Sequence, residues 1–522
     1  MQRLIQNKHL HRFIFTALIF WLSTQLVTHT IFGPIDFDEG YNMQAPQQLI
    51  QTGQYASHDG VHDQKITTGA TLLLPAAAFL AIFDHPLAPR IATVLFSLLL
   101  FYLLMRHIYQ NIYERLFGII LLGAVPLFYF FATTLLGEIP GLTLVLLAYI
   151  LYEKGKLRWS IFVLALAALT KTTYIFALIP LLMYPILVHA IGTDIATKPT
   201  SKWAEIIDHI SDWFMEHFVE PETKPAKIET VKYLLGFASI YSIPFIAWEL
   251  YRFSSFDGNT SAYLQNINNA LDWGRSQGHM RPDLITQRYE MFVQVLGVGP
   301  LLIVLLTSIW VFLTIHFRNK VSIATGMLAQ FALIWIMYHL LFGATAWYRH
   351  LFPGIVALVA TVPIVFRILP KPNRTQLITI SLIAILPLLI FLSRIIFQDS
   401  NDRFAYLVKR QNLLFLDQSN RPYLRSKQIL NDQYEVAKFI RTNIKNSERI
   451  AGLGWYNAPQ ISYLTGRNIE RKIGEETNYV IIDLWARNLN EGGVEVFMKR
   501  SPTLIFQNAT YEIYKVEKQF QK

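Results

Sequence analysis

The chain has 522 residues, of which 53% are apolar and 14% aromatic, and it contains no cysteine. The absence of cysteine from the sequence excludes disulfide bonds, thiolate metal ligands and cysteine nucleophiles. The formal net charge is +10. Lys and Arg nevertheless lie mostly in short loops beside long apolar runs, a pattern typical of membrane topology and not of a nucleic-acid-binding face.

Long apolar runs bounded by charged residues predict eleven transmembrane helices. A bilayer core about 30 Å thick requires roughly 20 apolar residues per helix. No secretory cleavage site follows the first run, so we expect this run to remain as an anchor. The runs lie near residues 13–31, 91–105, 116–137, 139–152, 159–170, 173–191, 232–250, 292–315, 321–342, 351–366 and 376–393.

A further apolar run, at 70–83, is shorter and contains Pro75. If this run crossed the membrane, the basic clusters at 106–115 and 154–158 would lie outside, against the positive-inside rule. If it does not cross, these clusters and the basic N-terminus all lie in the cytoplasm. We therefore predict a re-entrant or interfacial helix on the outer face, where neighbouring helices can cover it.

Polar segments between the spans predict the outer parts of the protein. Residues 32–87 and 251–291 are expected to form outer loops of a membrane domain that covers 1–396. The basic residues of the N-terminus place it in the cytoplasm, and an odd number of spans then places the tail, 397–522, on the outer side. The tail is predicted to be a small α/β domain, because helix-like and strand-like patterns alternate in it. These patterns are a helix near 434–444 and strands near 449–453, 479–483 and 511–516.

Residues 201–220, between the sixth and seventh spans, are predicted to form an amphipathic helix on the cytoplasmic leaflet. Its acidic face argues against binding to anionic lipid, so we expect a structural role. The apolar face comprises Trp203, Ile206, Ile207, Ile210, Trp213, Phe214 and Phe218.

Acidic residues gather in two places near the outer face. Asp36, Asp38 and Glu39 follow the first span, and Glu138 is the only charged residue between positions 115 and 153. A carboxylate at the membrane edge is costly without a partner or water, which makes it a functional candidate. Because the predicted topology places both groups outside, they can converge on one outward-facing cavity. The alternative is that each acid faces water in an ordinary loop.

Cationic residues lie at two outer junctions. Arg349 and His350 precede the tenth span, and Lys171 lies between the fifth and sixth spans. An Arg side chain presents a planar fork that matches phosphate oxygens. Both cations can instead extend to the bilayer interface from a helix end, and for Lys171 this second explanation is the favoured one.

With these residues in place, the membrane part of the chain resembles the GT-C glycosyltransferases. It is most similar to bacterial relatives of protein O-mannosyltransferases and aminoarabinose transferases, which are like glycosyltransferase family 39. The resemblance rests on the order of the segments DFDEGYNMQAPQQLIQTGQYAS, ITTGATLLLPAAAFLAIF, LLGEIPGLTLVLLAYILYEKG, LALAALTKTTYIFALIPLL and YRHLFPGIVAL. It implies an α-helical polytopic membrane protein of GT-C type, to which the α/β tail is added.

The resemblance also implies roles for individual residues. Asp38 would act as the catalytic base with Glu39 beside it, Glu138 would be the acid of the second outer loop, and Arg349 would contact the carrier phosphate. Lys171 or Lys65 would assist Arg349. Asp63 and Lys65 stand where relatives carry an acid and a basic residue, although the prolines of that motif are missing here. Further candidates are Asp36, Tyr41, Asp63 and His350.

Together, residues and resemblance predict an inverting hexosyl- or pentosyltransferase of the bacterial inner membrane. Its donor would be a polyprenyl-phosphate sugar, and its acceptor a hydroxyl of a protein, lipid or glycan on the extracytoplasmic face. Membrane lipids are the other expected partner, and nucleic acid is not expected. Some GT-C enzymes need a divalent metal, so Mg or Mn held by Glu39 and Glu138 stays an open prediction.

Two other classes of membrane protein stay open. A polysaccharide polymerase or ligase would rely on basic residues of a late outer loop, and the 251–291 loop carries Arg275, His279, Arg281 and Arg288. A flippase or transporter is less favoured, because the sequence shows no internal repeat and its acids gather at one surface.

Overall fold

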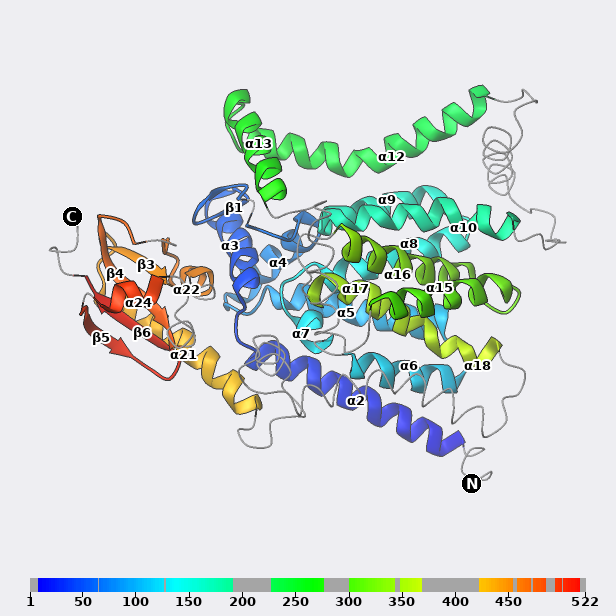
Figure 1. The fold of residues 1–522 in the computed structure, drawn as a ribbon, viewed down its shortest axis with the longest axis horizontal. Helices are drawn as coiled ribbons and strands as arrows, with labels where there is room; N and C mark the ends of the chain where they lie inside the picture. Colours follow the sequence, from blue (N-terminus) through cyan, green and yellow to red (C-terminus); the bar gives the residue numbers. More distant parts are fainter. Residues whose placement is uncertain are drawn as a thin grey trace.

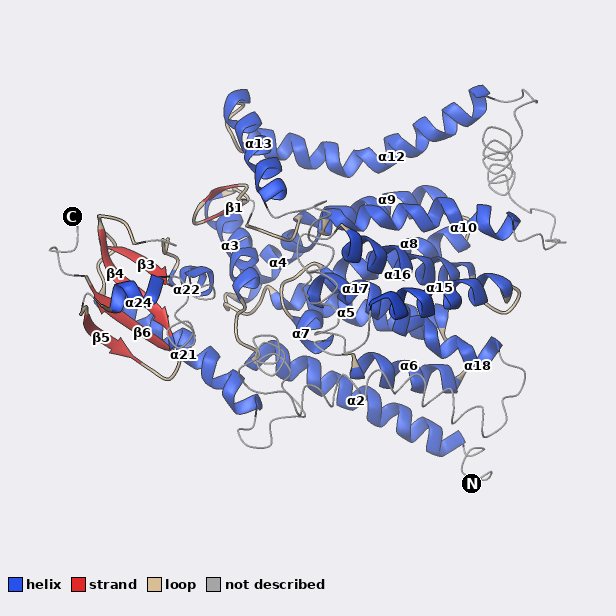
Figure 2. Cartoon of the chain, viewed as in Figure 1, coloured by secondary structure: helices blue, strands red, loops and turns tan. Residues whose placement is uncertain are grey.

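The computed structural model describes residues 8–63, 65–125, 128–190, 227–276, 300–342, 348–368, 422–453, 458–470, 473–484, 493–499 and 501–516. A helical bundle forms most of the described chain, and a small sheet lies beyond one end of it (Figures 1 and 2). The helices α3 and α4 lie at the same end of the bundle as this sheet, and α2 begins at the opposite end (Figure 1).

The first part of the bundle is built from residues 8–190. Its elements are α2 (Lys8–Phe32), α3 (Phe37–Thr52), β1 (Ala56–Ser57), β2 (Gly60–Val61), α4 (Ala70–Phe83), α5 (Arg90–Leu103), the π-helix η1 (Leu104–Ile108), α6 (Ile112–Ala124), α7 (Phe128–Thr133), α8 (Glu138–Glu153), α9 (Leu157–Thr170), the 3-10 helix η2 (Thr172–Ala177) and α10 (Leu178–Ala190).

The second part of the bundle lies between residues 227 and 368. Its elements are α12 (Lys227–Ser254), α13 (Thr260–Ser276), α15 (Pro300–His316), α16 (Ile323–Leu341), α17 (Tyr348–Thr361), η4 (Val362–Ile364) and α18 (Val365–Ile368). The helices α8, α16 and α17 enclose the largest apolar core, in which Tyr149, Phe331 and Phe352 are fully buried.

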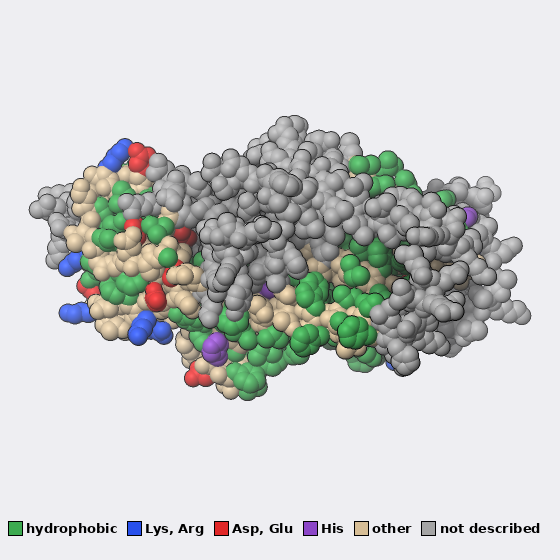
Figure 3. Space-filling view, turned by 90° about the horizontal axis from the view of Figure 1, so that it is seen from below, with side chains coloured by type: hydrophobic (Ala, Val, Ile, Leu, Met, Phe, Trp, Pro, Cys, Tyr) green, Lys and Arg blue, Asp and Glu red, His purple; other side chains and the backbone are tan. Residues whose placement is uncertain are grey.

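Four helical segments among the described residues are long and apolar enough to cross a membrane. They are Phe13–Phe32, Arg90–Ile108, Ile323–Leu341 and Arg349–Ile368. Apolar side chains spread over the described surface of the bundle (Figure 3). Shorter apolar helices cover Ala70–Phe83, Leu157–Thr170, Thr172–Tyr184 and Leu302–His316.

The predicted span at 116–137 does not form one helix. The helix α6 ends at Ala124, and α7 begins at Phe128. Val125 between them is extended, with φ −63° and ψ 124°. The next residue is Pro126, and the proline ring disfavours the helical conformation of the residue before it. The region of this predicted span therefore contains two helices instead of one.

Several sequence predictions fall on undescribed parts of the chain. The span at 376–393, the amphipathic helix at 201–220 and the loop residues His279, Arg281 and Arg288 lie outside the described residues. Arg275 falls in the last turn of α13.

The run at 70–83 forms the helix α4 with the predicted bounds. Its 14 residues extend about 21 Å, which is shorter than a bilayer core. The N–H of Gly69 donates to the carbonyl of Thr170 at 2.8 Å, which ties α4 to the end of α9. A Cβ at position 69 would lie 1.8 Å from the carbonyl oxygen of Leu169, so this close approach requires glycine.

The tail forms the α/β fold that the sequence predicts. Its four-stranded sheet has the order β3-β4-β6-β5, in which only the β3–β4 pair is parallel. The edge strand β5 was missed, because its side chains are mostly exposed and give a weak apolar signal. The elements are α21 (Pro422–Asn443), β3 (Arg449–Leu453), α22 (Ala458–Thr465), β4 (Thr477–Asp483), α24 (Val494–Met498), β5 (Thr503–Gln507) and β6 (Tyr511–Lys515).

Candidate functional site

Glu39 and Arg90 form a buried ion pair beneath the first turn of α3. Both side chains have no exposed surface. Arg90 donates from Nε and Nη2 to the two carboxylate oxygens at 2.7 Å each. Its other N–H groups donate to the carbonyls of Thr30, Gly33 and Pro34 at 2.8 to 3.1 Å. This pair therefore joins the end of α2 and the loop after it to both α3 and α5.

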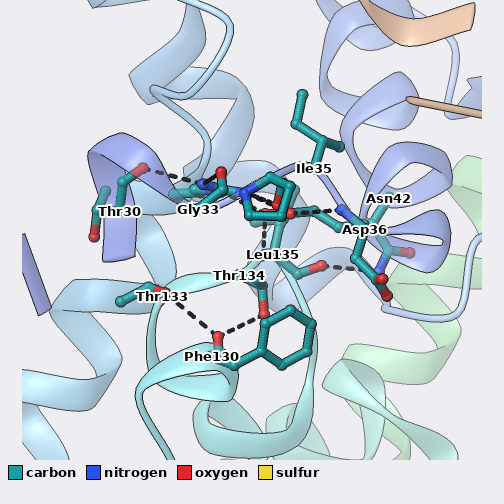
Figure 4. Close-up of polar contacts among 12 residues, drawn as sticks. Thr30, Gly33, Ile35, Asp36, Asn42, Phe130, Thr133, Thr134 and Leu135 are labelled. Atoms are coloured by element: carbon teal, nitrogen blue, oxygen red, sulfur yellow. Dashed lines mark hydrogen bonds and ion pairs between the residues drawn. The ribbon is translucent and has the colours of Figure 1, made fainter. Parts of the chain in front are cut away.

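The same helix is joined to the segment that precedes α8. Glu39 Oε1 accepts the N–H of Leu135 at 2.9 Å, and Asn42 donates to the carbonyl of Leu135 at 2.8 Å. The amide oxygen of Asn42 accepts the N–H groups of Thr67 and Thr68 at 2.9 and 3.2 Å. Asn42 and Leu135 thus hold α3 close to the start of α8 (Figure 4).

Four charged residues from four separate segments converge beside this network. Asp38 lies in the first turn of α3, Glu138 begins α8, Lys171 follows α9, and Arg349 lies in the first turn of α17. Arg349 Nη1 pairs with the carboxylate of Asp38. Arg349 Nε lies 3.9 Å from Glu138 Oε1, and Lys171 Nζ lies 2.5 Å from the same oxygen. Two cations therefore offset two carboxylates.

Exposure separates the members of this group of four. The side chains of Asp38, Arg349 and Lys171 are each 15% exposed, whereas that of Glu138 is 1% exposed. The second carboxylate oxygen of Glu138, Oε2, is buried without a hydrogen-bond partner among the described residues. An unsatisfied buried acceptor is costly, so a ligand hydroxyl that reached Oε2 would be favoured. Arg349 and Lys171 both point to carboxylates of the site.

Lys65, Asp63 and Tyr41 belong to a neighbouring cluster around the β1–β2 hairpin. Lys65 pairs with Asp59, and its Nζ lies 5.5 Å from the centre of the Tyr41 ring. The hydroxyl of Tyr41 donates to Asp59 at 3.5 Å. Asp63 accepts from the hydroxyl of Ser57 at 2.6 Å. Lys65 and Asp63 are thus held by the hairpin, and Tyr41 links this cluster to the helix that carries Asp38.

Asp36 and His350 occupy supporting positions. Asp36 is the N-cap of α3, and its N–H donates to Glu39 Oε2 at 3.3 Å. The ring of His350 stacks on His339 with centroids 5.5 Å apart, and its carbonyl accepts the indole N–H of Trp335 at 2.6 Å. His350 therefore packs against α16.

The residues present do not fit a divalent metal at Glu39 and Glu138. Both oxygens of Glu39 are bound by Arg90, and one oxygen of Glu138 is bound by Lys171. Among the residues that the structure describes, no group of three or more His, Asp or Glu side chains is placed to hold a metal ion. Ca, Mg and Mn sites require several oxygen ligands, which this arrangement does not offer.

The hairpin is fixed to α12 through the ring of His62. This ring stacks on Tyr55 and Phe256, with centroids 5.4 and 5.8 Å apart, and lies edge-on to Trp248 at 5.6 Å. Burial lowers the pKa of His62 to about 3, and the charge of Arg252 adds to this effect. We therefore expect His62 to be neutral in the folded protein near neutral pH.

Acid is expected to destabilise the fold through His62. In the unfolded chain the imidazole binds a proton below pH about 6.5, whereas the folded state does not until pH about 3. The contribution of His62 to the free energy of unfolding is thus fully present above pH about 6.5. It decreases as the pH falls from there toward the pKa of the folded state, by at most about 1.4 kcal/mol per pH unit. His62→Phe should reduce the dependence of the melting temperature on pH between pH 7 and 4. His85→Gln, at an exposed position, should not, and an equal slope in both variants would contradict the assignment.

Sequence reasoning missed Arg90 and Asn42. Arg90 is the one charged residue at the start of the second apolar run, and Asn42 follows Asp38 by one helical turn. Both residues can be noticed in the sequence, but the sequence does not show which residues they contact.

Comparison with known proteins identifies the fold. The scan of protein-family models found no match, and no curated protein matches the chain. The solved structure of ArnT from Cupriavidus metallidurans bound to undecaprenyl phosphate matches with a TM-score of 0.58 at 11% identity, over 96% of this chain and 97% of that chain. The structure of the same protein in the apo state matches with a TM-score of 0.39 at 11% identity, over 97% of this chain and 98% of that chain. The chain therefore has the fold of this ArnT structure over nearly its whole length, which confirms the predicted resemblance at the level of the fold. The four apolar helices of membrane-spanning length agree with a membrane protein.

Proposed function

We propose that the chain is a membrane glycosyltransferase that moves a sugar from a polyprenyl-phosphate donor to an acceptor hydroxyl. The observation that carries this proposal is the direct pairing of Asp38 with Arg349. It sets a carboxylate that can take a proton beside a cation that can bind phosphate. The ArnT structure of the same fold was solved with undecaprenyl phosphate, which supports a lipid-linked donor.

The reaction would be a single displacement with inversion. Asp38 accepts the proton of the acceptor hydroxyl while the hydroxyl oxygen bonds to the anomeric carbon. The bond between that carbon and the phosphate oxygen breaks, and the polyprenyl phosphate leaves with the electron pair. Arg349 stabilises the charge that develops on the phosphate. Lys171 and Arg349 both lie beside Oε1 of Glu138, so Lys171 adds positive charge to the phosphate-binding region.

The two glutamates would have different roles. Glu138 Oε2 is an acceptor without a hydrogen-bond partner in the described part of the chain, so it suits a hydroxyl of the donor sugar. Glu39 is enclosed by Arg90 and the Leu135 N–H, so we propose that it positions α3 instead of contacting substrate. Lys65 and Asp63 lie in the hairpin cluster, where Lys65 could meet a second charged group of the donor or acceptor.

The site lies where the bundle meets the tail, which suits a lipid-linked donor. The isoprenoid would remain among the apolar helices while the phosphosugar enters between α3, α8 and α17. By the charge distribution of the loops, this end is the extracytoplasmic one. We therefore propose a bacterial inner-membrane location, with the N-terminus cytoplasmic and the tail outside.

Mass spectrometry of the cell envelope tests this function. A strain that lacks the gene and a strain that carries Asp38→Asn should both accumulate the same lipid-linked sugar and lack the same glycosylated product. The mass that is missing from the product identifies the sugar. The molecule that loses this mass shows whether the acceptor is a protein, a lipid or a glycan. Unchanged lipid-linked sugars and glycans in both strains would refute the proposal.

Arg349→Lys should separate charge from geometry at the phosphate. The lysine keeps the positive charge but loses the two-pronged hydrogen bonding, which is worth about tenfold or more in binding. We expect the KM for donor to rise about tenfold while the KM for acceptor is unchanged. Arg449→Lys, at a side chain that is 55% exposed, is the matched control. An equal rise in both constants would argue against phosphate binding by Arg349.

A further inference from the structure

The tail domain binds the backbone of the chain just before Asp38. The side-chain oxygen of Gln433, on α21, accepts the N–H of Ile35 at 3.1 Å, and its NH2 group donates to the carbonyl of Ile35 at 2.9 Å. The side chain of Gln433 is fully buried, and Ile35 is 1% exposed. One amide therefore satisfies both backbone groups of a residue three positions before Asp38.

The tail domain also touches the chain just after Asp38. Gly40 faces the start of α22, where an added Cβ would lie 2.7 Å from the backbone N of Gln460 and 2.8 Å from the backbone C of Pro459. One turn further along α3, Gln44 donates to the carbonyl of Pro459 at 3.0 Å. The backbones of α3 and α22 therefore approach closely at Gly40, and the two helices lie side by side (Figure 1).

Contacts at the margin of this interface extend the attachment. The oxygen of Gln44 accepts the N–H of His58 at 2.9 Å, and His58 Nδ1 lies 2.9 Å from the hydroxyl of Ser462. The hydroxyl of Tyr463 donates to the carbonyl of Pro86 at 2.7 Å. The helix α22 therefore contacts α3, the hairpin and the segment before α5 together.

From these contacts we infer that the tail domain is part of the catalytic site, in which α21 and α22 hold α3 so that Asp38 meets Arg349, with Gln433 as a positioning residue. This inference rests on the proposed function. The helix α3 has no overall apolar character and contains Pro46, so its place depends on tertiary contacts more than on its own propensity. Arg90 holds one side of its first turn, and the tail holds the other.

Gln433→Met tests the positioning role at nearly constant volume. The thioether keeps the packing but neither accepts from nor donates to Ile35. A reacting group that moves by about 1 Å can lose up to about 100-fold in rate, so we expect kcat to fall about 10- to 100-fold. The KM for donor should stay constant, and rates should be counted per donor-binding site to exclude misfolded protein. The control is Gln428→Met, at an exposed position of the same helix.

Gln433→Glu supplies a readout that a merely structural role would not move. Only the protonated carboxyl can both donate to the Ile35 carbonyl and accept from its N–H. Its kcat relative to the wild type should therefore rise as the pH is lowered, whereas that of Gln433→Met should not.

Gly40→Ala tests the same interface from the membrane side. The methyl group must displace backbone atoms of α22, so we expect the same loss of kcat. Gly236→Ala, in α12 with open space around it, should leave kcat unchanged. If Gln433→Met and Gly40→Ala retain full kcat while Asp38→Asn is inactive, the positioning inference fails and the proposed function stands. If Asp38→Asn is fully active, the proposed function itself fails.

Discussion

Asp38→Asn is expected to lower the rate of sugar transfer by about 100- to 10,000-fold, because a general base contributes a factor of this size. The amide has nearly the same shape as the carboxylate and can still contact Arg349, but it cannot accept the proton of the attacking hydroxyl. The KM for donor should change little. The measurement is kcat of the purified protein in detergent or nanodiscs with a polyprenyl-phosphate sugar.

The control for this prediction is Asp84→Asn. Asp84 is an exposed acid at the end of α4 with a φ of +43°, a conformation that Asn also adopts. This variant should retain full activity. A polymerase or ligase would instead depend on the basic loop, so loss of activity on changing Arg275, His279, Arg281 and Arg288, with activity kept in Asp38→Asn, would favour that rival class.

Arg90→Met is expected to lower the free energy of unfolding by about 3–5 kcal/mol, because it leaves the charge of Glu39 buried without its partner. Both side chains are fully buried. The three carbonyls that Arg90 binds also lose their donors. Denaturant unfolding in detergent, followed by tryptophan fluorescence, measures the effect.

The double variant Glu39→Leu/Arg90→Met separates charge burial from packing. Replacing both members of a buried pair by apolar residues is often much less harmful than removing one of them. We therefore expect the double variant to be more stable than Arg90→Met, while its activity stays low because α3 is no longer fixed. Arg449→Met, which breaks exposed ion pairs, should change stability by about 1 kcal/mol at most. Equal instability of the single and double variants would contradict this account.

The sequence alone determined several of the helices, three strands of the tail and the residues that are chemically unusual. Apolar runs of fixed length have local causes, so the helices near 13–31 and 321–342 and the short helix at 70–83 could be predicted. The alternation of apolar residues likewise predicted three strands of the tail. A lone acid such as Glu138 between apolar runs is visible because its burial is costly.

Only the tertiary structure decided which charge meets which. Asp38 and Glu39 are adjacent in sequence, but successive side chains on a helix point about 100° apart. One of them therefore faces Arg349 on α17, and the other faces Arg90 on α5. The attachment of the tail to α3 through Gln433 joins residues 398 positions apart. No local pattern encodes such contacts, because they depend on how whole segments pack.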